Sequence, residues 1–189
     1  MKIRRMLILI LLLTLLMAAL AVSVSAETVS GICGDNLTWT YNGSGTLTIS
    51  GTGAMYDYPY SASPEDLHPW CYFEGEIKNI VVKSGVTYIG DNAFSCCIVA
   101  TSVTIPSTVT AMGDAVFADC FYLTSVKIPN SVTSIGKSTF SRCPRLTSVQ
   151  LSTGLTEIPV DMFEDCMALK SITIPASVKT IGKIGRAHV

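Results

Sequence analysis

The segment Thr124–Leu146 decides the fold of this chain and reads TSVKIPNSVTSIGKSTFSRCPRL. Near its start, Val126 and Ile128 alternate with polar residues, which predicts a short β-strand with one buried face. Pro129 follows directly and ends that strand, because proline has no backbone N–H to donate to a neighbouring strand.

The rest of the segment predicts how the chain returns to its starting point. Val132 and Ile135 form a second pair of inward side chains, and Gly136 permits a turn. Phe140 and Cys143 are three residues apart, as on the inner face of one helical or 3-10 turn. The segment is therefore one closed coil with an apolar interior.

The same pattern recurs every 23 residues, and this period is the strongest signal in the sequence. A fixed period in this range indicates a solenoid, in which stacked coils bury the faces that one coil cannot bury alone. We predict four full copies and one partial copy over residues 77–183. The repeated positions are Phe94, Phe117, Phe140 and Phe163; Cys97, Cys120, Cys143 and Cys166; Ile80, Val103, Val126, Val149 and Ile172; and Ile89, Met112, Ile135, Ile158 and Ile181.

A different pattern precedes the repeats, over residues 27–76. Alternating residues at 37–41 and 46–49 flank Asn42-Gly-Ser-Gly45, which predicts a β-hairpin. Because a solenoid needs its first coil covered, we expect this block to be a small N-terminal cap.

The repeat resembles the BspA-type leucine-rich repeats of bacterial surface and secreted proteins. The likeness is carried by L-x-x-V-x-I-P, then V-x-x-I-G, then F-x-x-C, over residues 77–182. The block before it, including Gly31–Trp39 and Pro69-Trp70, is similar to the segment that often leads such arrays. The resemblance implies a leucine-rich-repeat solenoid for adhesion or recognition, without catalytic activity. Ser152, Gly154 and Pro159 depart from the pattern in the fourth copy.

Residues 1–26 predict export. A basic start, an apolar run and Val24-Ser-Ala26 are the parts of a cleaved secretory signal peptide, although an uncleaved membrane anchor is the alternative. Cleavage removes three basic residues and leaves 10 basic against 14 acidic residues, a net charge of −4. We therefore expect a secreted or cell-surface protein that does not insert into the membrane after cleavage and does not bind nucleic acid.

The last residues, Ile184–Val189, abandon the repeat and resemble a translated sequencing adapter. The fifth coil then lacks its phenylalanine and cysteine. We expect residues 170–189 to fray and the chain to associate end to end, because an uncapped coil exposes apolar surface and strand edges.

The cysteines could suggest disulfides, a metal strip or a thiol nucleophile. Their 23-residue spacing points instead to packing, with one inward thiol in each coil and no histidine beside it. We expect Cys97, Cys120, Cys143 and Cys166 to be buried and reduced, and we expect no metal or other cofactor. Cys33 with Cys71 is the one pair considered for a disulfide. His68 and Cys71 lack an orienting third group for nucleophilic catalysis.

The outward strand positions form the candidate binding face, a strip of small polar residues. Two functions remain open: a non-catalytic adhesion module that binds a protein or glycan ligand, and a targeting or spacer segment of a larger exported protein, such as an enzyme, whose C-terminal part is missing. The strip consists of Asn79, Ser102, Thr104, Ser125, Lys127, Ser148, Gln150, Ser171 and Thr173, with Val81 beside Asn79.

Overall fold

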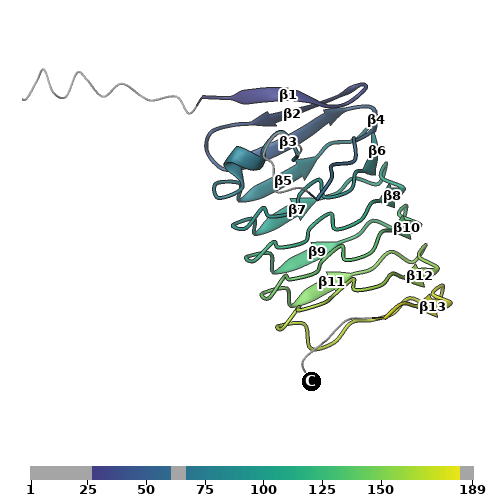
Figure 1. The fold of residues 1–189 in the computed structure, drawn as a ribbon. Coiled ribbons are helices and arrows are strands. Elements are labelled where there is room, and N and C mark those ends of the chain that lie inside the picture. Colours follow the sequence, from purple (N-terminus) through teal and green to yellow (C-terminus); the bar gives the residue numbers. More distant parts are fainter. Residues whose placement is uncertain (1–26, 61–66, 184–189) are drawn as a thin grey trace, which may run out of the picture.

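A computed structural model describes residues 27–60 and 67–183. Figure 1 shows them as one stack of coils, with the N-terminal strands at one end and the last coil at the other. The expected signal peptide, residues 1–26, and the expected adapter remnant, residues 184–189, lie outside the described residues. In the described part of the chain, no helix combines the length and the apolar character needed to cross a bilayer.

The strands expected from the apolar–polar alternation form a parallel ladder, which we call the first ladder. Its members in the repeats are β5 (Asn79–Val82), β7 (Ser102–Thr104), β9 (Ser125–Lys127) and β11 (Ser148–Gln150). β5 pairs with β7 and β9 pairs with β11, in each case one repeat apart. In β9 and β11 the middle residue is buried and both flanking residues are exposed, as the alternation predicts. The predicted solenoid with short parallel strands is confirmed.

A second parallel ladder runs beside the first and was not predicted. It contains β4 (Gly53–Ala54), β6 (Val86–Ile89), β8 (Ala111–Met112) and β10 (Ser134–Ile135), and then a separate pair, β12 (Glu157–Ile158) and β13 (Thr180–Ile181). The second inward pair of each coil thus includes a ladder residue, such as Ile135 beside Met112. Figure 1 shows that both ladders run along the length of the stack.

The N-terminal block covers the first coil. β2 (Leu37–Tyr41) and β3 (Thr46–Gly51) form the predicted hairpin, and β1 (Val29–Gly34) adds a third antiparallel strand on the outer side of β2. β3 then pairs in parallel with β5, so the cap continues the first ladder. A short 3-10 helix, η2 (Cys71–Phe73), leads into the repeats.

The predicted helical turns are single turns closed by hydrogen bonds between residues three apart. In the third coil, Ser141 N–H donates to Ser138 O at 2.9 Å and Leu146 N–H donates to Cys143 O at 3.1 Å. Ser138 and Arg142 have left-handed backbone with φ of 55° and 56°, which a continuing right-handed helix does not tolerate. Each turn therefore stops after a few residues, and the chain enters the next coil.

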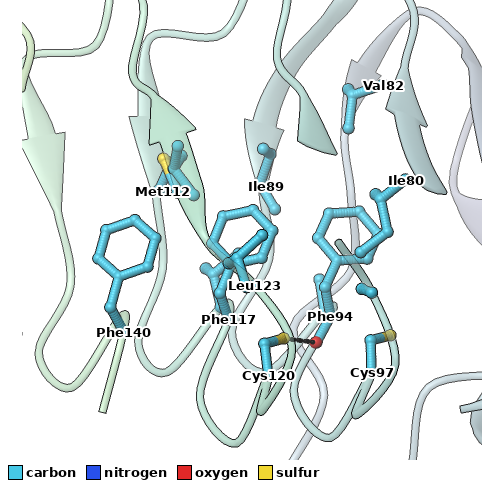
Figure 2. Close-up of a cluster of buried hydrophobic side chains, with 14 of the residues drawn as sticks. Ile80, Val82, Ile89, Phe94, Cys97, Met112, Phe117, Cys120, Leu123 and Phe140 are labelled. Atoms are coloured by element: carbon cyan, nitrogen blue, oxygen red, sulfur yellow. Dashed lines mark hydrogen bonds between the residues drawn. The ribbon is translucent and has the colours of Figure 1, made fainter. Parts of the chain in front are cut away.

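The phenylalanine column forms the centre of the core. Neighbouring rings from Phe94 to Phe163 stack with centroids 5.6–5.8 Å apart, and Trp70 extends the stack at 5.8 Å from Phe94. Figure 2 shows the rings in one row and the Cys120 thiol aimed at the Phe94 carbonyl. That thiol donates to Phe94 O at 3.3 Å, and the next two coils repeat this bond at 3.1 and 3.0 Å. Each of these three cysteines, Cys120, Cys143 and Cys166, therefore also links its coil to the preceding one.

Both ladders are interrupted once. The second ladder breaks between β10 and β12, where Pro159 replaces the glycine of the other coils. The equivalent N–H groups of Gly136 and Gly182 donate to the preceding coil at 3.0 and 2.7 Å, and proline has no such donor. The first ladder breaks between β7 and β9, which belong to separate sheets.

Candidate binding face

The polar strip predicted from the sequence lies on the outer side of the first ladder. Ser102, Thr104, Ser125, Lys127, Ser148 and Gln150 are exposed on its strands, whereas Asn79 is partly buried. Ser171 and Thr173 are exposed in the last coil, where no strand is formed. The exposed strand positions face solvent because β-strand side chains alternate and their neighbours fill the core.

The chemistry of the strip is that of hydroxyl and amide groups with one positive charge. Ser102 Oγ donates to Asn79 Oδ1 at 2.7 Å, so these two residues engage each other. Lys127 is the only ionisable residue in the strip. A surface of this kind binds a ligand by hydrogen bonds and shape and offers few charged contacts.

Two hollows indent the strip. The larger, of about 530 Å³, is lined by Val103, Thr104, Ile105, Ser107, Lys127, Pro129, Asn130 and Gln150. The smaller, of about 310 Å³, is lined by Ser148, Val149, Gln150, Leu151, Thr153, Thr173 and Pro175. Because Gln150 borders both, the hollows follow one another along the strip. Asn79, Ser102, Ser125 and Ser171 of the strip line neither hollow.

A third hollow, of about 540 Å³, lies on the turn side and was missed in the sequence analysis. Its carboxylates join neighbouring coils: Asp91 Oδ1 accepts from Asp114 N–H at 2.7 Å, and Asp114 Oδ1 accepts from Lys137 N–H at 2.9 Å. Arg142 forms a salt bridge with Asp119 one coil away. The 23-residue spacing of Asp91 and Asp114 could have indicated this role. These acidic groups are engaged in holding the turns together.

The pair considered for nucleophilic catalysis is packed into the cap. The His68 side chain is 1% exposed, stacks on Trp70 at 5.3 Å and places Nε2 3.1 Å from Ser95 O. Burial lowers the pKa of His68 to about 4, so the imidazole is neutral at pH 7. Burial is also the main cause that raises the pKa of the Cys71 thiol. The burial of His68 and the raised pKa of Cys71, which leaves less thiolate, suit packing better than nucleophilic attack.

The predicted burial of the repeated cysteines is confirmed, since Cys97, Cys120, Cys143 and Cys166 are at most 8% exposed. Cys33 is also buried and is a free thiol, so the Cys33–Cys71 disulfide considered above is not formed in the structure. Among the described residues, no group of three or more histidine, cysteine, aspartate or glutamate side chains could hold a metal ion.

We predict slow alkylation of the four repeated thiols in the folded protein. Burial raises the pKa of Cys97, Cys120 and Cys143, and raises that of Cys166 to about 11, so few thiolates exist at pH 8. Iodoacetamide labelling read by peptide mass spectrometry should modify the partly buried Cys71 and Cys96 first and the four core thiols only in denaturant. Disulfide-linked peptides among the four would contradict their predicted reduced state.

The sequence and the fold are both similar to known proteins. The family model described as BspA type leucine-rich repeat region matches residues 66–184 in six copies. A leucine-rich repeat protein from Eubacterium ventriosum is 22% identical, with a TM-score of 0.48 over 83% of this chain and 62% of its own. The T. pallidum leucine-rich repeat protein is 22% identical, with a TM-score of 0.47 over 73% and 78%.

The structure of the pneumococcal vaccine antigen PcpA is also similar, at 15% identity and a TM-score of 0.50 over 86% of this chain and 48% of its own. This chain therefore spans about half of PcpA and less than two thirds of the Eubacterium ventriosum protein. None of the curated protein sequences compared with the chain matches it.

Proposed function

Because the chain belongs to the BspA-type leucine-rich repeat family, we propose that it is a non-catalytic binding module that recognises a protein or glycan ligand through the polar strip. The observation that carries the proposal is the pair of adjoining hollows in the exposed strip. Stacked coils present equivalent groups side by side, which suits a ligand bound by many weak contacts. The family is generally non-catalytic, and the packing of His68 and Cys71 supports the same role for this chain.

The site of action that we propose is the cell surface or the extracellular space. It rests on the signal-peptide pattern of residues 1–26, with its basic start, apolar run and small-residue exit. A polar strip with a single lysine also fits a ligand other than nucleic acid, which would call for a basic surface.

The triple variant Ser125→Glu, Lys127→Glu, Gln150→Glu tests the proposed face. The three positions are exposed, so the fold should persist while carboxylates crowd the centre of the strip. Ligands are first selected by binding the unmodified protein to an array of immobilised extracellular proteins and glycans. We expect the variant to bind them at least about tenfold more weakly, a loss of about 1.4 kcal/mol.

The matched control is Ser134→Glu, Thr156→Glu, Lys179→Glu. These positions are exposed on or beside the second ladder, and the change of net charge is the same. The control should bind as the unmodified protein does, and circular dichroism should show both variants folded. Unchanged affinity in the strip variant would refute the proposed face.

A further inference from the structure

The larger of the two hollows in the polar strip, lined by Val103, Ile105 and Lys127 among others, lies where the first ladder is interrupted. Elsewhere backbone bonds join successive coils beside this ladder, as from Thr101 N–H to Lys78 O at 2.9 Å and from Thr147 N–H to Thr124 O at 2.9 Å. Between β7 and β9 no strand pairing is formed. The same two coils stay joined on their other sides, through β8 with β10 and through Ala115 N–H to Lys137 O at 2.8 Å. These two coils therefore lack strand pairing beside the polar strip and stay joined by hydrogen bonds on their other sides.

Beside this interruption, two apolar side chains are less buried than their counterparts in the neighbouring coils. Ile80 and Val126, which occupy the position of Val103 in the neighbouring coils, are 1% and 5% exposed, whereas Val103 is only partly buried. Ile105 is likewise partly buried, whereas Ile128 at the same position is 1% exposed. Val103 and Ile105 both line the hollow and give it an aliphatic wall.

The rim of the hollow carries one charge. Lys127 is the only ionisable group lining it, beside the uncharged Thr104, Ser107, Asn130 and Gln150. Among the described residues, the lysine and arginine side chains that form salt bridges are those of Lys137 and Arg142, so the Lys127 ammonium forms none. An aliphatic wall beside an ammonium group complements a ligand that carries an aliphatic group and a carboxylate a few ångströms apart.

We infer that this hollow receives an extended peptide segment of a protein partner, with an aliphatic side chain against Val103 and Ile105 and a carboxylate beside Lys127. This inference rests on the proposed function and names the class of ligand at its face. No strand pairing joins β7 and β9, and the hollow lies beside this interruption on the exposed face, where an extended main chain can lie across it. In an extended segment, residues two apart point to the same side, so the two anchors stand at positions i and i+2.

A synthetic peptide tests the inference without a known partner. The probe is acetyl-Gly-Thr-Leu-Thr-Glu-Gly-amide, which places Leu and Glu two residues apart. NMR titration of isotope-labelled protein should give saturable shifts at Val103, Ile105 and Lys127, with a Kd on the order of 1 mM. Replacing Glu by Gln, or Leu by Ser, should weaken binding at least about fivefold. The Lys127→Gln variant should bind the Glu and Gln peptides equally, because the charge they discriminate is gone.

The pair Thr104→Trp and Thr173→Trp supplies a steric control. Both threonines are exposed and occupy the same position of different coils, but only Thr104 lines the larger hollow. Tryptophan at 104 should fill the hollow and abolish the shifts, and tryptophan at 173 should leave them unchanged.

Three results of the peptide titration would overturn the inference: equal binding of the Glu and Gln peptides by the unmodified protein, equal loss in the two tryptophan variants, or no shifts up to about 10 mM peptide. These results do not contradict the proposed function if the triple glutamate variant still binds the ligands selected on the array more weakly than the unmodified protein does. Array binding that depends on glycans alone would also exclude a peptide as the occupant. Conversely, unchanged array binding by the triple variant would reject the proposed function even if the peptide binds.

Discussion

Replacing Phe117 by alanine is expected to lower the free energy of unfolding by about 3–5 kcal/mol. The Phe117 side chain is fully buried, and its ring lies 5.6 Å from each of Phe94 and Phe140. Alanine would leave a cavity in the middle of the stack and remove two ring contacts. Because the stability of a solenoid depends on contacts between neighbouring coils, this loss should weaken the array on both sides of the cavity. Urea unfolding followed by circular dichroism measures the effect.

Phe121→Ala is the matched control, since the same side chain is removed from a position that is 43% exposed. It should cost less than about 1 kcal/mol, because much of that ring already contacts water. Equal losses in the two variants would show that the stacked column does not dominate the core. A Phe117→Leu variant should recover part of the stability by filling most of the space.

The core could be predicted from the sequence because each of its columns repeats at one interval. Phe94, Phe117 and Phe140 need no knowledge of the neighbouring coil to be assigned to the interior, and all three are fully buried. The second ladder could not be predicted in this way. Its strands in the later coils, such as β8 and β10, are two residues long, too short for an alternation to be recognised.

The position of the hollows could not be predicted from the 23-residue period. Alternation places Thr104 and Lys127 on the outer face, and both are exposed there. The opening between their strands depends on how two coils are spaced, and nothing within either coil reports that spacing. Val103 and Val126 are the same residue at the same position, yet only Val126 is fully packed. The sequence gives more indication of the break in the second ladder, because Pro159 departs from the glycine of the other repeats.

In the 189-residue chain, backbone amides of the last coil should exchange with deuterium at least about 100-fold faster than their counterparts two coils earlier. Gly136 and Gly182 N–H donate to the preceding coil at 3.0 and 2.7 Å, and Thr133 and Lys179 N–H do so at 2.9 and 2.8 Å. These bonds are alike in length, so their geometry alone predicts similar protection. Exchange through local opening depends instead on the contacts that opening breaks.

Those contacts differ between the two coils. Ile135 is 8% exposed, whereas Ile181 is 54% exposed and Ile174 is 38% exposed, so opening the last coil gives up less apolar burial. β13 pairs with β12 alone, and Pro159 leaves that pair without strand pairing to β10. NMR-detected exchange at pH 7 should therefore find residues 172–182 weakly protected and residues 126–135 strongly protected. Equal protection would mean that the last coil is held closed by contacts beyond those that bury its side chains, and our expectation that this coil opens readily would be wrong.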